Sequence, residues 1–332
     1  MYKYDKPFIG PFAELLEQLL QEKRMAGLKY IESARQMHKL DELSCSYDCA
    51  NGLPKELVMD FTERKPNWHQ STQEHLISTT REVAAYLIRN GVPAYMIDKS
   101  RVTKRYENFK PYIFTHTQME KIFSIADNIK TRESVNSHIF YPTVLRVQYG
   151  CGLRISETLN LKMKDVDLKE NLLYVYDAKN HKDRIVPMHA TVSAVCGSYA
   201  AKIHPTYQSN DYFFQSRWGN GHYDKGSVNS YFREILFQCD LSHGGRKNGG
   251  PRLHDLRHTF SVHSLESMLK QGISHQVALP LLSTYLGHTS LSATGRYLRL
   301  TAEVFPELEQ QIESIYSEIL PDLEVQFYEE TD

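Results

Sequence analysis

Hydrophobic side chains in the first hundred residues recur at helical spacing. Residues 9–26 and residues 71–91 each place apolar positions three and four apart, and the second stretch opens with a capping box and closes with a glycine. These positions are Phe12, Leu15, Leu16, Leu19 and Leu20 in the first stretch, and Ser71, Glu74, Leu76, Val83, Ala84, Leu87 and Gly91 in the second. The pattern predicts a small helical domain over residues 1–98.

The helical pattern resumes at Thr115 and is interrupted once. Residues 141–149 predict a buried helix that ends at a Gly-Cys-Gly turn, and residues 252–272 predict another, with glycine as its stop. Residues 171–189 instead hold two β-rich runs around a polar tip, which predicts a hairpin. The expected fold is therefore mainly α with a small antiparallel β-sheet (α+β).

Charge and prolines suggest how the chain is divided. A basic, polar linker is expected over residues 99–111, followed by a second domain over residues 112–300. After Pro306, apolar residues at helical spacing predict an acidic tail helix within residues 301–332, which needs an apolar groove on its own domain or on a neighbouring protomer. These apolar residues are Leu308, Ile312, Ile315, Tyr316 and Ile319.

The net charge of −1 conceals an uneven distribution. Residues 301–332 hold ten acidic residues and no lysine or arginine, which leaves 39 basic against 30 acidic residues in the remainder. A basic body fits a partner with a phosphate backbone, although a surplus of nine over 300 residues is also ordinary for a globular protein. Charge alone does not decide between them.

The cysteines and the N-terminus indicate where the protein works. The five cysteines are odd in number and include no Cys-x-x-Cys pair, which favours reduced thiols in a cytosol over a disulfide framework or a zinc site. No apolar run approaches the length of a membrane span, and the first residues do not resemble a signal peptide. We expect a cytoplasmic protein.

Four side chains near the C-terminal end suggest phosphate chemistry. His254 and Arg257 are three apart, so a helix shows both on one face. A second helix that ends near Leu286 and is capped by Gly287 delivers His288 at its terminus, and Tyr297 follows nine residues later. A cation, two imidazoles and a phenol gathered in this way suggest attack on a phosphate ester by tyrosine.

Arg154 is the second candidate cation. It stands at the start of a short predicted helix, where Glu157, one turn later, could hold it by a bidentate pair. An ordinary surface Arg–Glu pair explains this segment equally well.

Further basic residues lie in predicted loops. The linker carries Lys99, Arg101, Lys104 and Arg105, which could lie along a DNA backbone or form a solvated connector. Arg246 and Lys247 stand in a glycine-rich loop that could grip a phosphate or act as a plain hinge, and this loop does not match a Walker A motif. Lysines on the hairpin tip are usually just solvated, but one over a cleft could reach a leaving oxygen.

In chain order and spacing these candidates resemble the tyrosine recombinases, also called the phage integrase family. The resemblance covers residues 111–300 and rests on three boxes: 152–157 (GLRISE), 254–259 (HDLRHT), and 286–288 (LGH) leading to Tyr297. It implies a catalytic domain in which Arg154, Arg257, His254, His288 and Tyr297 are the catalytic residues. It also implies that the N-terminal helices form a core-binding domain that clamps DNA. This part of the resemblance rests only on the position of the domain and its helical pattern.

The hairpin departs from the family pattern. The family usually has Gly-Lys-Gly where this chain has Ala178-Lys179-Asn180. The following residues favour Lys179 as the catalytic lysine, and Lys182 remains an alternative.

The resemblance implies a site-specific recombinase or integrase that forms a 3′-phosphotyrosine without metal, cofactor or ATP. Its partners would be double-stranded DNA attachment sites, three further protomers and accessory directionality factors, in a bacterial cytoplasm at the nucleoid. The tail and the divergent N-terminal domain favour an integrase of a mobile element over a chromosome-dimer resolvase. The alternatives are a type IB topoisomerase, a telomere resolvase, or a DNA-binding relative that no longer cuts.

Overall fold

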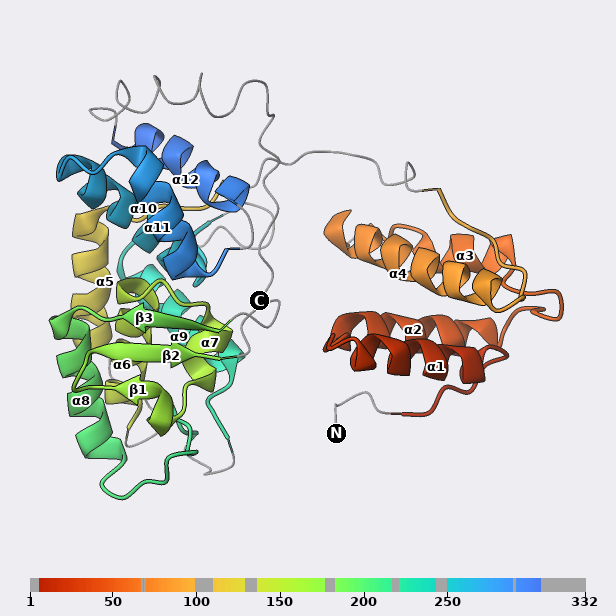
Figure 1. The fold of residues 1–332 in the computed structure, drawn as a ribbon, viewed down its shortest axis with the longest axis horizontal. Helices are drawn as coiled ribbons and strands as arrows, with labels where there is room; N and C mark the ends of the chain where they lie inside the picture. The colour runs from red at the N-terminus through yellow and green to blue at the C-terminus, as the bar shows by residue number, and fades with distance from the viewer. Residues whose placement is uncertain are drawn as a thin grey trace. The chain divides into compact units, whose positions relative to one another are not determined.

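The computed structural model describes residues 6–66, 68, 70–98, 110–128, 136–176, 183–216, 221–242, 250–288 and 291–305. Within them the chain forms twelve α-helices and one three-stranded sheet (Figure 1). It divides into two compact units, Met1–Glu107 and Asn108–Asp332. The mainly helical α+β prediction is confirmed.

The first unit is a helical domain. Its helices are α1 (Ala13–Met25), α2 (Ile31–Ser44), α3 (Lys55–Thr62) and α4 (Gln70–Arg89). The predicted apolar stripes form its core, in which Leu16, Leu19 and Leu87 are almost completely buried. One detail differs from expectation: α4 begins at Gln70, so Ser71 lies inside its first turn and is not the capping residue. Sequence patterns locate helix ends only to within one or two residues.

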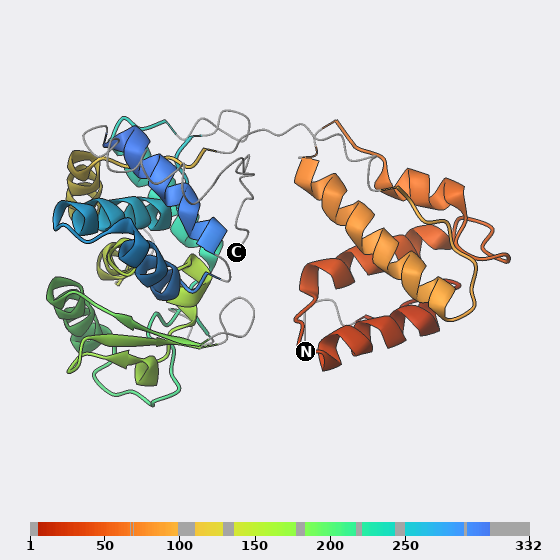
Figure 2. The ribbon, with the colours of Figure 1, turned by 45° about the horizontal axis from the view of Figure 1, so that its top comes forward.

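The second unit places a helical body beside a small sheet. Its helices are α5 (His116–Asn128), α6 (Ser137–Gly150), α7 (Ile155–Asn160), α8 (Ala190–Ile203), α9 (Lys225–Gln238), α10 (Asp255–Lys270), α11 (His275–Leu286) and α12 (Leu291–Val304), with a short 3-10 turn, η2 (Met163–Asp165). Two apolar clusters hold this unit together, one around α6 and α9 and one shared by α10, α11 and α12. Figure 2 shows the last three helices side by side.

The predicted hairpin is present as two strands of an antiparallel sheet. β2 (Leu172–Val175) pairs with β3 (Arg184–Pro187), and β1 (Val166–Asp167), which the sequence did not indicate, pairs with the other edge of β2. Leu173 pairs with Val186, and both side chains are buried against the helical body. The register of the hairpin therefore decides which way the side chain of Arg184 points.

None of the helices in the described part of the chain is both long and apolar enough to cross a membrane.

Candidate active site

Arg154 stands at the entrance of α7, as predicted. It is the residue that precedes the helix, in extended conformation, and it is 6% exposed. Its Nη1 donates to Glu157 Oε1 at 3.0 Å, while its backbone N–H donates to the other oxygen of Glu157 at 2.9 Å. Glu157 therefore holds both the side chain and the backbone of Arg154. The pair is buried and is not the surface pair that the sequence left open.

Arg257 lies in the first turn of α10 and is completely buried. Its guanidinium donates to two backbone carbonyls from distant parts of the chain, Gly152 at 2.6 Å and Leu286 at 2.8 Å. Its Nη1 also lies 3.9 Å from Glu157 Oε2. These contacts bring the first arginine box, the second arginine box and the end of α11 to one place.

The bidentate partner of Glu157 is an arginine that the sequence analysis did not single out. Arg184, the first residue of β3, donates from Nη1 to Glu157 Oε1 at 3.0 Å and from Nη2 to Oε2 at 2.7 Å. The expected bidentate pair of Glu157 with the Arg154 guanidinium is therefore wrong: Arg154 donates to Glu157 once from its side chain and once from its backbone, and the bidentate pair is formed by Arg184. An arginine at the start of a strand gives no sequence signal of its direction, which explains the omission.

The charge on Glu157 is strongly stabilised. Burial by itself would raise the pKa of this carboxyl, but the hydrogen bonds and charge of Arg184, with the charges of Arg257 and Arg154, lower it from 4.5 to about 2. One carboxylate thus stands among three guanidinium groups. The surplus positive charge suits an anionic ligand such as a phosphodiester.

His288 connects the arginine cluster to α12. The residue before it, Gly287, caps α11 as the sequence predicted, and it does so in the left-handed conformation. The Nε2 atom of His288 lies 3.2 Å from Arg257 Nη2, and its Nδ1 atom lies 2.8 Å from Thr294 Oγ1. Because a guanidinium can only donate, Nε2 accepts, and the proton of neutral His288 is on Nδ1 and is donated to Thr294.

Tyr297 lies on α12, and its side chain is completely buried. Its hydroxyl oxygen lies 3.0 Å from Nδ1 of His258 and 3.4 Å from Nη2 of Arg296. The ring of His288 stacks nearly parallel to the phenol, at 6.1 Å between centroids. His258 lies in the second box but was not among the expected site residues, although it is the histidine bonded to the candidate nucleophile.

His254 is the residue that precedes α10, and it is half-buried. Its ring meets the ring of His258 edge-on, with 4.8 Å between centroids. His254, His258 and Tyr297 therefore form a continuous row. The structure brings together Arg154, Glu157, Arg257, His288 and Tyr297. His254 contacts His258, which in turn contacts the phenol.

The remaining expected site residues lie outside the described residues. These are both hairpin lysines, the linker residues and the glycine-rich loop residues: Lys179, Lys182, Lys99, Arg101, Lys104, Arg105, Arg246 and Lys247. The tail after Phe305 also lies outside them.

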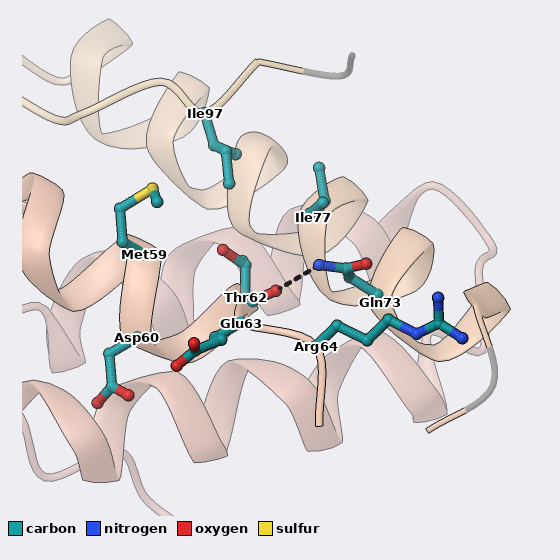
Figure 3. A pocket seen from close by; sticks show the side chains of 8 residues that line it. All are labelled: Met59, Asp60, Thr62, Glu63, Arg64, Gln73, Ile77 and Ile97. Carbon is teal, nitrogen blue, oxygen red and sulfur yellow. Dashed lines mark hydrogen bonds between the residues drawn. The ribbon is translucent and has the colours of Figure 1, made fainter. Parts of the chain in front are cut away.

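A pocket of ≈ 440 Å³ lies in the first unit and shares no residue with this cluster (Figure 3). Two carboxylates, one guanidinium and apolar side chains line it, and Gln73 Nε2 donates to the backbone carbonyl of Thr62 at 3.0 Å beside it. Its lining residues are Met59, Asp60, Thr62, Glu63, Arg64, Gln73, Ile77 and Ile97. The mixed charges indicate no particular ligand.

Comparison with known proteins gives one consistent result. The phage integrase family model matches residues 113–303. The chain is 27% identical over 311 residues to a Sinorhizobium fredii protein that bears the name integrase/recombinase y4rB, covering 92% of this chain and 98% of the relative. It is also 27% identical over 238 residues to tyrosine recombinase XerC of Staphylococcus saprophyticus, covering 71% of this chain and 73% of XerC.

A solved structure shares the fold. The XerH site-specific recombinase bound to its palindromic difH substrate, in a post-cleavage complex, aligns over 91% of this chain and 84% of its own, with a TM-score of 0.62 at 20% identity. The family model covers more than half of the chain and includes every described residue of the cluster. The chain belongs to the phage integrase family, the tyrosine recombinases.

Proposed function

We propose that this protein is a site-specific DNA recombinase, an integrase of a mobile element, that cuts and rejoins DNA through Tyr297. The observation that carries the proposal is the chain of contacts Arg154–Glu157–Arg257–His288–Thr294, which ends on the helix of Tyr297. It joins two cations suited to a phosphodiester to a tyrosine that is bonded to a histidine. These are the requirements for attack by a phenol on a charged ester.

In the proposed reaction, Tyr297 Oη attacks phosphorus and the bond from phosphorus to the 5′ oxygen breaks. Arg154 and Arg257 neutralise the non-bridging oxygens as negative charge builds up. The phenol proton passes to a histidine, and a general acid protonates the departing 5′ oxygen. The products are a 3′-phosphotyrosine and a free 5′-hydroxyl. A second DNA hydroxyl reverses the step, so the proposal includes no metal, cofactor or ATP.

We assign the proton transfers to two regions. His258 is bonded to the phenol, and His254 and His288 flank that pair, so His258 is the best-placed acceptor. The sequence favoured Lys179 as the general acid, with Lys182 as the alternative, and both follow β2 in the hairpin. Arg257 and Tyr297 are buried in the free protein, so DNA binding has to open the cluster before a phosphate reaches them.

The proposed partner is double-stranded DNA at attachment sites, contacted by the helices of residues 1–98 and by the basic residues of the linker and the glycine-rich loop. Recombination exchanges strands in pairs, so we propose four protomers on two sites, with accessory factors that set direction. The acidic tail would dock on a neighbouring protomer. The place of action would be the nucleoid in a bacterial cytoplasm. The DNA-bound state of XerH supports the partner class.

The test is a suicide DNA substrate, nicked beside a candidate attachment site that flanks the gene, followed by a denaturing gel. A covalent protein–DNA band with 3′ linkage that Tyr297→Phe abolishes is the expected result. DNA binding with no covalent band would support the alternative of a DNA-binding relative that no longer cuts, since such a protein would behave like its Tyr297→Phe variant. With a supercoiled plasmid as a second substrate, relaxed circles would indicate a type IB topoisomerase, and hairpin ends would indicate a telomere resolvase.

A further inference from the structure

Arg184 occupies a central position in the cluster, where its guanidinium binds other parts of the protein. All three nitrogen atoms of its guanidinium are engaged within the protein: Nη1 and Nη2 hold both oxygens of Glu157, and Nε donates to the backbone carbonyl of Tyr285 at 3.0 Å. The side chain is 8% exposed. An arginine used in this way orders its surroundings, because its planar fork fixes the direction of each partner.

The first partner, Glu157, controls the two candidate phosphate-binding arginines. Its Oε1 accepts from Arg154 and Arg184, and its Oε2 accepts from Arg184 and lies 3.9 Å from Arg257. Without Arg184, only Arg154 among the described residues would hold this carboxylate, through its backbone N–H and Nη1, and the carboxylate could turn to pair more fully with Arg154 or Arg257. Either pairing would withdraw positive charge from a bound phosphate.

The second partner, α11, is connected to β3 in both directions. Arg184 binds the carbonyl of Tyr285, and the Tyr285 hydroxyl donates to the carbonyl of Pro187, at the other end of β3, at 2.9 Å. The end of α11 lies directly against the guanidinium. A Cβ on Gly287, where φ is +70°, would stand 3.1 Å from Arg184 Cδ and 3.2 Å from Nη1.

The end of α11 is also where Arg257 is held. The carbonyl of Leu286 accepts from Arg257 Nη2, and His288 meets the same nitrogen. Arg184 therefore contacts both structures that aim the arginine pair, namely Glu157 and the end of α11.

We propose that Arg184 is a positioning residue of the recombinase, which acts through Glu157 and the end of α11 to keep the guanidinium groups of Arg154 and Arg257 directed at the scissile phosphate. The inference rests on the proposed function. In this role Arg184 supports neutralisation of the non-bridging oxygens of the phosphate, and it takes no part in protonation of the departing 5′ oxygen.

The test compares two scissile groups in single-turnover cleavage by Arg184→Met. The first substrate has the ordinary phosphodiester. The second has a methylphosphonate, in which a neutral methyl group replaces one non-bridging oxygen, so little charge remains for the arginines to neutralise. We expect the variant to cleave the phosphodiester more slowly by on the order of 100-fold, as misplacement of a catalytic group by about 1 Å produces. Its loss on the methylphosphonate should be less than about 5-fold, because charge neutralisation contributes little there.

Two controls separate positioning from general damage. Arg146→Met removes another bidentate arginine, which pairs with Asp127 at 2.8 and 2.7 Å, and it should leave both rates close to the parent's. Arg184→Lys keeps the charge without the fork, so most of the loss on the phosphodiester should remain. If Arg184→Met fails to fold, Arg184→Lys provides the same comparison of substrates.

Equal losses on the two substrates, or no loss on either, would overturn the inference. A third substrate, with sulfur in place of the 5′ oxygen, needs no general acid because a thiolate leaves unaided. Rescue by this substrate alone would also overturn it, since Arg184 would then serve the leaving group. If the parent forms no covalent complex with any of the three, the proposed function itself fails, and the inference fails with it.

Discussion

The Nδ1 atom of His258 lies 3.0 Å from the hydroxyl oxygen of Tyr297, and both side chains are buried. His254, the histidine that the second box suggests, meets the ring of His258 edge-on, with 4.8 Å between the ring centroids. The direct contact makes His258 the group best placed to take the proton of the nucleophile.

Replacement of His258 by asparagine should slow formation of the covalent complex by on the order of 100-fold or more, which is the usual contribution of a general base. Asparagine can keep a hydrogen bond to the phenol but cannot accept its proton at neutral pH. Rates of single-turnover cleavage would measure the effect. Incorporation of 3-fluorotyrosine at position 297, a more acidic phenol, should restore part of the lost rate.

A matched control is available on the same helix. The Nδ1 atom of His263 lies 2.9 Å from the hydroxyl oxygen of Tyr149. His263→Asn therefore removes an equivalent histidine–tyrosine pair away from the nucleophile. Cleavage by His258→Asn at the parent's rate, or faster, would show that the contact only restrains the phenol.

Thr294 should matter because it fixes the ring of His288. Valine has the same shape but accepts no hydrogen bond, so Thr294→Val removes the acceptor that Thr294 provides for the Nδ1–H of His288 and allows the other tautomer. A lost buried bond costs about 1–3 kcal/mol, which predicts a cleavage rate lower by roughly tenfold or more, with DNA affinity unchanged. Thr294→Ser retains the oxygen and should cleave nearly as fast as the parent. If serine and valine are equally slow, the hydroxyl is not the reason.

Gly152 should not tolerate a side chain. Its φ is +58°, and an added Cβ would stand 2.3 Å from the ring of Phe260. We expect Gly152→Ala to lower the free energy of unfolding by about 2–4 kcal/mol, from backbone strain and overpacking together. Cleavage should also slow, because the Gly152 carbonyl holds Arg257 at 2.6 Å. Urea unfolding and single-turnover cleavage would measure the two effects.

Gly91→Ala provides the control for strain alone. Gly91 also has a positive φ, +80°, but a Cβ there would meet no atom within 4 Å. A loss of stability as large as that of Gly152→Ala would show that the Phe260 contact adds nothing.

Glu157 should make the stability of the fold depend on pH in the acid range. Its pKa is lowered from 4.5 to about 2 in the folded protein, so its stabilising contribution is complete above 4.5 and is lost as the pH falls towards 2. The parent should therefore lose on the order of 3 kcal/mol of unfolding free energy over this window that Glu157→Gln does not lose. Urea unfolding at several pH values between 5 and 2.5 would measure the difference.

At neutral pH, Glu157→Gln should itself be less stable by about 3–5 kcal/mol, because it leaves buried guanidinium groups without their carboxylate. Asp127→Asn is the control, since its pair with Arg146 is partly exposed and should contribute less than about 1 kcal/mol. An identical pH slope for the parent and Glu157→Gln would contradict the buried network.

The sequence by itself determined the elements and the order of the chemistry. Periodicity located the helix of Arg257, the glycine stop before His288 and the hairpin, because those signals are local: apolar spacing, glycine caps and β-rich runs. The three boxes then identified the family. The runs of β1 and α7 are too short to carry a periodic signal, so their lengths came only from the structure.

Only the tertiary structure decided which of these groups touch. Arg184 and Glu157 are 27 residues apart, and their pairing depends on the register of β3 against β2, since a shift of one residue would turn Arg184 to the other face. His258 and Tyr297 are 39 residues apart, and successive helical residues point about 100° apart, so the packing of α12 on α10 decides that His258 meets the phenol. Long-range packing determines these directions, and local patterns carry no information about it.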